Sequence, residues 1–166
     1  KIQGEKKKCE EGRGGYIGFK LNALTDKDII DALIDASKSG VVIQLLVRGI
    51  CCLIPGIPGK TENISVRSIL EHSRIYRFGQ GEEEELYIAS ADCMTRNTLR
   101  RVEVAVPIWD PENKNRVRKI FDLGFQDTEK GKWLLSDGLY HDPEGVQEER
   151  FDSQDFFYRE AYRNLE

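Results

Sequence analysis

The chain has 166 residues, of which 33% are charged and 39% hydrophobic, as is typical of a single globular domain. No apolar run approaches the roughly 18 residues of a membrane span, and no signal peptide opens the chain, so we expect a cytoplasmic protein, with association to a membrane surface left open. The formal charge of −4 argues at first against a polyanionic ligand, but residues 137–166 hold nine acids against three bases and the rest of the chain is slightly basic.

The chain divides into a short polar start and one domain. Residues 1–15 are polar and rich in glycine, which predicts a linker or a frayed end and leaves residues 16–166 as the folded domain. The four cysteines include an adjacent pair but no C-x-x-C spacing, so neither a zinc site nor a disulfide framework is indicated. Buried free thiols are the expected alternative.

The first half of the domain predicts a strand, a helix and a second strand. The run YIGFKLNAL (residues 16–24) alternates as a strand does, and residues 25–40 follow as an amphipathic helix capped by Thr25 or Asp26. The nearly continuous apolar run VVIQLLVRG (residues 41–49) is typical of a strand buried on both faces. Together these elements predict a βαβ unit.

Ligands of such sheets collect at the carboxyl ends of the strands, which is where Arg48 stands. The loop CCLIPGIPGKTEN (residues 51–63), which contains two Pro-Gly pairs, follows at the same edge. Further arginines cluster later in the sequence: Arg74, Arg77, Arg96, Arg100 and Arg101. A guanidinium offers a planar fork of donors suited to phosphate, although solvated surface charge would explain the same pattern.

Four further strands are expected in the middle of the chain. Residues 64–69, 74–78 and 86–91 have strand-like composition, and the last two are joined by GQGEEEE, which predicts an exposed and mobile turn. The run RRVEVAVPI (residues 100–108) alternates cleanly, so we expect Val102, Val104 and Val106 on one face of a strand.

Two helices are predicted beyond that strand. Residues 110–125 begin with Asp110 as cap and Pro111 at the first helical position. Residues 153–165 should form a helix capped by Ser153, with an aromatic face suited to packing. The whole pattern predicts an α/β domain. Neither G-x-x-x-x-G-K-[ST] nor G-x-G-x-x-G occurs, so a phosphate ligand would be bound by arginine.

Three blocks in one order carry a resemblance: LVRGICCLIPGIPGKTENI, LEHSRIYRF and ASADCMTRNTLRRVEVAVPI. They resemble the final domain of bacterial polyphosphate kinase, which polymerises the ATP γ-phosphate into inorganic polyphosphate, and the resemblance runs from about Tyr16 to Trp133. It implies a phospholipase D-like fold with a mixed central sheet flanked by helices, within a larger enzyme. It also implies ATP or ADP and polyphosphate as partners, Mg²⁺ accompanying ATP, preceding domains of the same polypeptide and a homo-oligomer, and no nucleic acid.

The resemblance implies roles for three residues. The arginine of LVRG, Arg48, falls on an ATP contact of the family, and the histidine of LEHSR, His72, falls on an active-site residue that contacts phosphate and assists transfer. Arg101 falls on a further contact to the phosphate chain. The histidine that becomes phosphorylated belongs to the preceding domain, and we expect His141 to be an exposed loop residue.

We expect His72 to be at least partly exposed in a cleft shared with Arg48 and Arg101. Asp92 or Glu71 would orient its ring. Asp92 is also the nearest candidate for a metal ligand, but a structural role in the turn after a strand is the favoured interpretation.

Two departures from the family pattern qualify the resemblance. A phospholipase D catalyst carries H-x-K followed by four residues and Asp, whereas His72 is followed by Arg74 and then Gly79 at the aspartate position. Ile69 also runs directly into Leu70, where the family has about four more residues, which predicts a break in the chain or a true deletion. The alternatives are a phospholipase D-like phosphodiesterase and a non-catalytic docking domain.

Overall fold

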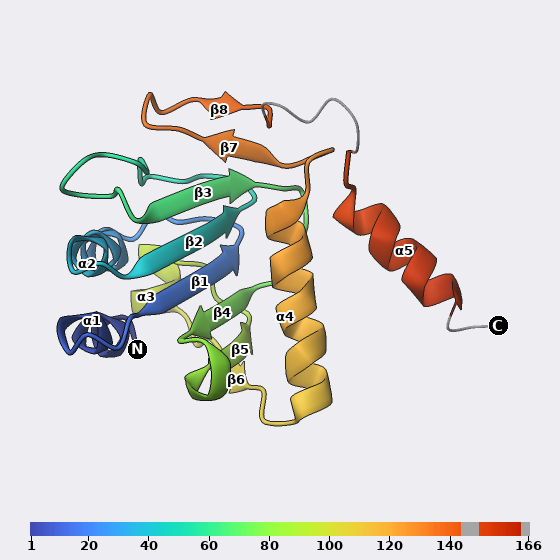
Figure 1. Cartoon of the computed structure of the whole chain (residues 1–166), viewed down its shortest axis with the longest axis horizontal. Helices are drawn as coiled ribbons and strands as arrows, with labels where there is room; N and C mark the ends of the chain where they lie inside the picture. The colour runs from blue at the N-terminus through green and yellow to red at the C-terminus, as the bar shows by residue number, and fades with distance from the viewer. Residues whose placement is uncertain (144–149, 164–166) are drawn as a thin grey trace.

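The computed structural model describes residues 1–143 and 150–163, which form an eight-stranded mixed sheet with helices on both faces (Figure 1). The strands are β1 (Tyr16–Leu21), β2 (Val42–Val47), β3 (Ile64–Ser68), β4 (Ile75–Phe78), β5 (Glu85–Ala89), β6 (Ala105–Pro107), β7 (Lys132–Leu134) and β8 (Tyr140–His141). The helices are α1 (Ile2–Glu10), α2 (Lys27–Lys38), the 3-10 turn η1 (Gly81–Glu83), α3 (Thr95–Arg100), α4 (Pro111–Gln126) and α5 (Ser153–Arg163).

The strand order is β6-β5-β4-β1-β2-β3-β7-β8. Strands β1, β2 and β3 are parallel, which confirms the predicted βαβ unit, and the strands outside them pair antiparallel. The predicted mixed α/β sheet flanked by helices is therefore confirmed.

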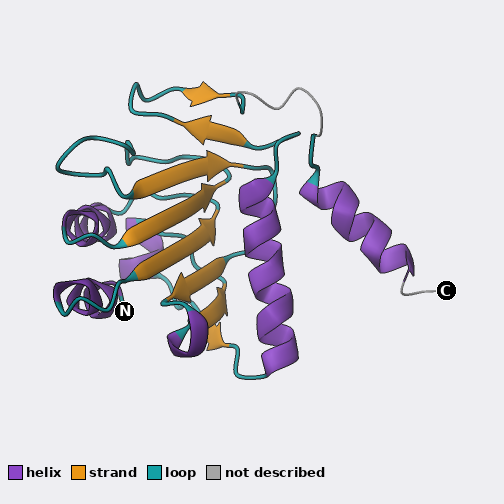
Figure 2. Cartoon of the chain, in the orientation of Figure 1, coloured by secondary structure: helices purple, strands orange, loops and turns teal. Residues whose placement is uncertain are grey.

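Helices cover both faces of the sheet (Figure 2), and a different core is buried on each face. On one face, Ile17 and Phe19 of β1 pack with Leu33 of α2, and α1 lies beside α2. On the other face, Leu46 of β2 packs with Phe121 of α4, and α5 lies outside α4. Successive side chains of a strand point to opposite faces, so residue 20 of β1 is directed toward α4.

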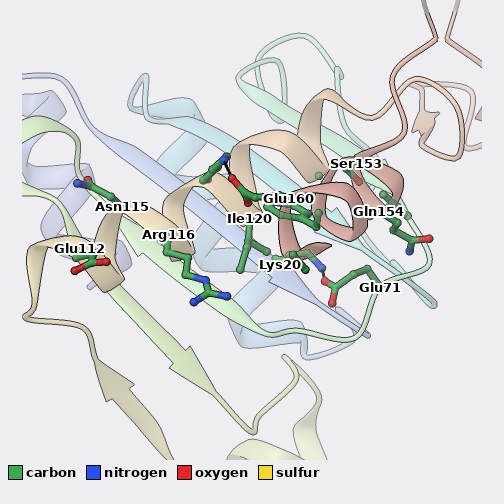
Figure 3. Close-up of a pocket in the computed structure, with 14 residues that line it drawn as sticks. Lys20, Glu71, Glu112, Asn115, Arg116, Ile120, Ser153, Gln154 and Glu160 are labelled. Atoms are coloured by element: carbon green, nitrogen blue, oxygen red, sulfur yellow. Dashed lines mark hydrogen bonds and ion pairs between the residues drawn. The ribbon is translucent and has the colours of Figure 1, made fainter. Parts of the chain in front are cut away.

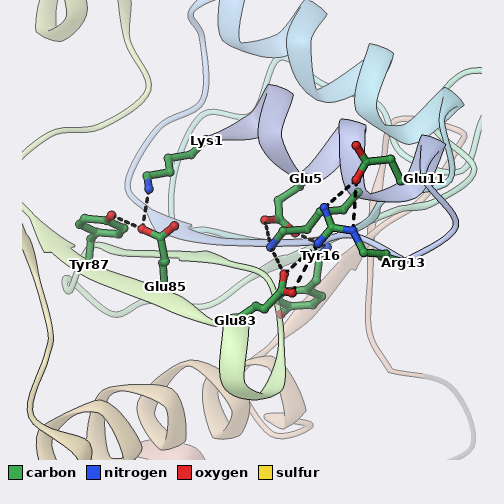
Figure 4. A network of polar contacts seen from close by, with 9 residues as sticks. Lys1, Glu5, Glu11, Arg13, Tyr16, Glu83, Glu85 and Tyr87 are labelled. Carbon is green, nitrogen blue, oxygen red and sulfur yellow. Dashed lines mark hydrogen bonds and ion pairs between the residues drawn. The ribbon is translucent and has the colours of Figure 1, made fainter.

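The start of the chain is folded, so the prediction of a linker or frayed end at residues 1–15 is wrong. Helix α1 lies against the sheet, and its Glu5 side chain is buried and accepts a hydrogen bond from the Tyr16 backbone N–H at 3.1 Å (Figure 4). Lys8 pairs with Glu5 at 2.8 Å and with Glu83 at 3.1 Å. The sequence KIQGEKKKCE shows no broad apolar stripe, and tertiary contacts fix the helix instead.

The predicted mobile turn at residues 79–85 is also different in the structure. The Glu84 side chain is only 1% exposed, because Arg77 donates to it at 2.6 Å and Arg118 pairs with it from α4. One acid of the EEEE run is therefore a buried anchor between β4 and α4.

The strand expected at residues 100–108 is reduced to the three residues of β6. Arg100 ends α3, and Val102 and Val104 are 98% and 58% exposed. Strand β5 ends at Ala89, and beyond it the Ser90 N–H still donates to the Val104 carbonyl oxygen at 2.9 Å, but the Val104 N–H donates to the Ser90 hydroxyl at 3.1 Å, so regular strand pairing stops there.

The helix caps are only partly as predicted. Asp26 and Asp110 each accept from a backbone N–H three residues on, at 3.1 and 2.8 Å, as expected for caps. For α5 the cap is Asp152, which accepts from the Gln154 and Asp155 amides, whereas Ser153 donates to Asp127 and is buried. The assignment of Ser153 as cap is therefore wrong.

The connection from β3 to β4 is a loop of residues 69–74, in which Ile69 is followed directly by Leu70, and the choice between a break and a true deletion stays a prediction. The Glu71 N–H donates to the Ile69 carbonyl oxygen at 3.0 Å within it. His141 was expected in an exposed loop. It lies in β8 instead, half-buried, with Nε2 2.7 Å from Asp137 Oδ2.

Candidate phosphate-binding site

The strand register brings the three predicted site residues to one edge of the sheet. Lys20 at the end of β1 pairs with Ile75 at the start of β4, and Ala89 at the end of β5 pairs with Ala105 at the start of β6. The residue after β2, the loop before β4 and the segment before β6 therefore share the carboxyl edge of the parallel strands. These positions are Arg48, His72 and Arg101.

Asp92 is the hub of this edge. Its Oδ1 accepts from the Asn22 N–H at 2.7 Å, and Arg74 donates to both carboxylate oxygens, at 2.9 and 3.1 Å. The Gly49 N–H donates to the Asn22 carbonyl oxygen at 2.8 Å, which joins the turn after Arg48 to the same network. Burial would raise the pKa of Asp92, but the bonds from Arg74 and Asn22 outweigh it and hold the pKa below its ordinary value. Asp92 is thus a structural carboxylate, as favoured from the sequence.

His72 is exposed at this edge, as predicted, and its neighbour is Arg74. One guanidinium nitrogen of Arg74 lies 3.4 Å from Nδ1 of His72 and donates to the His72 carbonyl oxygen at 3.3 Å. The expectation that Asp92 or Glu71 would orient the ring directly is wrong. Asp92 acts through Arg74, and Glu71 instead accepts from the Ser73 N–H and hydroxyl at 3.0 and 2.7 Å.

Arg48 is half-buried and Arg101 is exposed. Glu103 lies between these residues: the hydroxyl of Ser90 and the amide of Asn97 donate to it and lower its pKa, and the charges of Arg101 and Arg74 add to the effect. Arg48, Arg74 and Arg101 thus place three guanidinium groups along the same edge of the sheet as His72.

One cavity lies close to this edge, beside the His72 loop. This cavity of 710 Å³ lies on the other side of Glu71, between α4, α5 and the sheet (Figure 3). Its lining includes Lys20 and Glu71 but neither His72 nor the two predicted arginines.

Sequence reasoning missed two residues of this region. Arg74 was placed in an arginine cluster, yet its bridging of His72 and Asp92 depends on the pairing of β4 with β5. Lys20 is buried in β1, with its side chain 3% exposed, and pairs with Glu71. The sequence feature that could have revealed it is a lysine inside the apolar run YIGFKL, where a buried charge is rare unless it is paired.

In residues 1–143 and 150–163, no three His, Cys, Asp or Glu side chains converge in a way that could hold a metal ion. Asp92 has both oxygens occupied by Arg74 and Asn22. The donor set of this edge therefore fits an anion better than a resident cation. In the same described part, no helix is long and apolar enough to cross a membrane.

The mixed sheet flanked by helices on both faces is a phospholipase D-like α/β fold. Nuc, a phospholipase D family member from Salmonella typhimurium, superposes with a TM-score of 0.53 at 18% identity, over 73% of this chain and 82% of that chain. At that identity the likeness establishes the fold alone.

The chain belongs to the polyphosphate kinase C-terminal domain family. The family model "Polyphosphate kinase C-terminal domain 2" matches residues 1–154, a longer stretch than the sequence blocks indicated. A polyphosphate kinase from Staphylococcus epidermidis is 46% identical over 90% of this chain, and one from Bacillus cereus is 46% identical over 92%. The crystal structure of polyphosphate kinase from Porphyromonas gingivalis matches 98% of this chain with a TM-score of 0.91 at 36% identity.

The chain spans about a fifth of the length of these curated relatives, 21% and 22%, and 26% of the crystallised one. The family is thus established for this domain, whereas the activity of a whole enzyme involves parts that these 166 residues do not contain.

Proposed function

We propose that this chain is the phosphate-binding C-terminal part of a polyphosphate kinase. It would bind the phosphates of ATP and polyphosphate for reversible transfer of the ATP γ-phosphate, through a phosphohistidine on a preceding domain of the same polypeptide, in a homo-oligomer in the cytoplasm. What supports the proposal is that Arg48, His72 and Arg101 lie along one edge of the sheet, in a chain whose relatives are named polyphosphate kinases.

The chemistry suits such a division of labour. Phosphoryl transfer depends mainly on neutralising charge on the transferred oxygens and on aligning attacking and leaving groups. Arg48 and Arg101 supply fixed positive charge. His72 has Arg74 beside Nδ1, and its other ring nitrogen, which meets no hydrogen-bond partner among the described residues, could hold or deliver a proton at a phosphate oxygen.

Mg²⁺ would reach this site as a companion of the ATP phosphates, where it neutralises charge on the β- and γ-oxygens. The chain's own contribution would be arginine and histidine donors on the opposite side of the phosphate chain. A phospholipase D-type hydrolysis is disfavoured, since Gly79 stands at the aspartate position and lies at the far end of β4 from His72.

The test is a pair of histidine variants in a polyphosphate kinase polypeptide that carries this domain. His72→Ala should lower turnover by about 100-fold or more, the size of a lost proton-transfer or charge-stabilising group, while the thermal midpoint stays near that of the parent. His141→Ala, the matched control in β8, should change neither.

The isolated 166-residue chain should incorporate no label from γ-labelled ATP, because the proposed acceptor histidine lies outside it. Incorporation by this chain that persists in His72→Ala would contradict the proposal.

A further inference from the structure

Lys20 is a buried cation in the middle of the sheet. It is the last but one residue of β1, its side chain is 3% exposed, and it lies under α4, where its Cε would be 3.8 Å from a methyl group placed on Gly124. Burial lowers the pKa of Lys20 to about 8, which weakens its preference for the charged form, and a carboxylate beside the ammonium favours that charge.

That carboxylate belongs to Glu71, the residue before His72. Lys20 Nζ pairs with Glu71 Oε2, and Figure 3 shows the two side chains meeting at the edge of the cavity. The same carboxylate accepts from the Ser73 N–H and hydroxyl, so it closes a small ring around the backbone of His72. Both neighbours of His72 are therefore held by the Lys20 ammonium, Glu71 directly and Ser73 through Glu71.

The other anchors of the loop are different in kind. Gln154 of α5 donates to the Leu70 carbonyl oxygen at 2.6 Å, and Arg74 is held by Asp92. Gln154 and Arg74 both lie nearer the surface than Lys20. The lysine therefore provides the link between the loop and the rigid centre of the sheet.

We propose that Lys20 is a positioning residue for His72, which through Glu71 and Ser73 holds the loop in the conformation that presents the imidazole to phosphate. The inference rests on the proposed function for the role of His72, but the contact network that carries it is independent of any activity.

Stability alone does not account for a lysine at this position. Burying an ion pair costs desolvation that its attraction rarely exceeds, and replacement of both partners by hydrophobic residues of similar size is often neutral or stabilising. The apolar neighbours Ile69 and Ile120 would accommodate such a side chain. A charge kept beneath the His72 loop is explained if it orders that loop.

The experiment uses the 166-residue chain, isotope-labelled, with Lys20→Met as the test variant. The chain has two histidines, so the His141 imidazole signal is an internal reference for that of His72. Lys119→Met is the matched control, because Lys119 lines the same cavity but pairs with Glu160 of α5 rather than with the loop. NMR spectra and binding of long-chain inorganic polyphosphate are recorded for each.

Lys20→Met should shift and broaden the His72 ring signals and the amide signals of residues 71–73, and leave His141 unchanged. Its polyphosphate affinity should fall about fivefold, which corresponds to about 1 kcal/mol, and the thermal midpoint should change little, because the Glu71 carboxylate left without its partner is only half-buried. Lys119→Met should leave the His72 signals and the affinity unchanged.

Glu71→Gln breaks the same contact from its half-buried end and should reproduce the His72 shifts, which covers the case in which Lys20→Met does not fold. Wild-type His72 signals in both folded variants, or in Glu71→Gln alone if Lys20→Met does not fold, would overturn the inference. If the wild-type chain binds no polyphosphate, the proposed function fails, but the NMR comparison still decides whether Lys20 positions the loop.

Discussion

At the scale of single residues, Asp92 organises the candidate site. Its carboxylate accepts hydrogen bonds from the Asn22 backbone N–H, just after β1, and from the Arg74 guanidinium, just before β4. Arg74 in turn contacts His72. The bidentate arginine contact is strong and geometrically specific. An acid next to the site thus supports the cations that would bind phosphate instead of binding a metal.

Asp92→Asn should destabilise the chain more at pH 7 than at pH 3. The folded pKa of Asp92 is held below its ordinary value of about 3.9, chiefly by Arg74 and Asn22 against the effect of burial. Its contribution to stability is therefore present above about pH 4 and is lost as the pH falls through the folded pKa. Urea unfolding of both proteins at the two pH values measures the difference. Equal destabilisation at pH 3 and pH 7 would show that the charge of Asp92 does not matter.

The site residues could be predicted from the sequence only to the level of their strand ends. Arg48 follows an evident buried strand, so its place at the carboxyl edge was predictable. The contacts of His72 were not, because they depend on Arg74 and Asp92, which lie 18 residues apart and meet through the pairing of β4 with β5. Lys20 escaped notice because its partner Glu71 is 51 residues away.

At the scale of elements, the predictions were correct where residues close together in the sequence determine the structure. Asp26 and Asp110 cap α2 and α4 as expected, and the apolar pattern defined the βαβ unit. Helix α1 and the turn at Glu84 were mispredicted because each depends on a distant partner, the Tyr16 amide and Arg118 respectively. Alternation of valines before β6 resembled a longer strand, yet the strand beside it ends at Ala89.

Two glycine substitutions should have opposite effects on stability, because Gly18 lies where β1 packs against α4 and Gly4 lies in α1 with nothing close to it. A Cβ on Gly18 would lie 2.9 Å from the Cζ of Phe121, which is fully buried, so Gly18→Ala should destabilise the fold by about 1–3 kcal/mol through overpacking. Gly4→Ala in α1 meets nothing within 4 Å and should stabilise the chain by about 0.5–1 kcal/mol. Chemical denaturation checks both values. A neutral Gly18→Ala would mean that α4 packs less closely on β1 than described.

At the scale of the whole molecule, the net charge of −4 conceals a division of charge. The excess of acids lies in residues 137–166, while Arg48, His72, Arg74 and Arg101 lie along the carboxyl edge of the sheet. The phosphate-binding capacity of the domain would therefore follow from this one edge, and its strength would depend on salt as charge pairing does.

Calorimetric titration of the 166-residue chain with inorganic polyphosphate measures binding at this edge. We expect binding at low salt that weakens about tenfold between 50 and 200 mM salt, as counterion release gives for two or three charged contacts. Arg48→Ala and Arg101→Ala should each weaken it by about tenfold or more, while Arg159→Ala, which removes an exposed arginine of α5, should not. No binding at 50 mM salt, or equal affinity in all three variants and the wild type, would contradict the account.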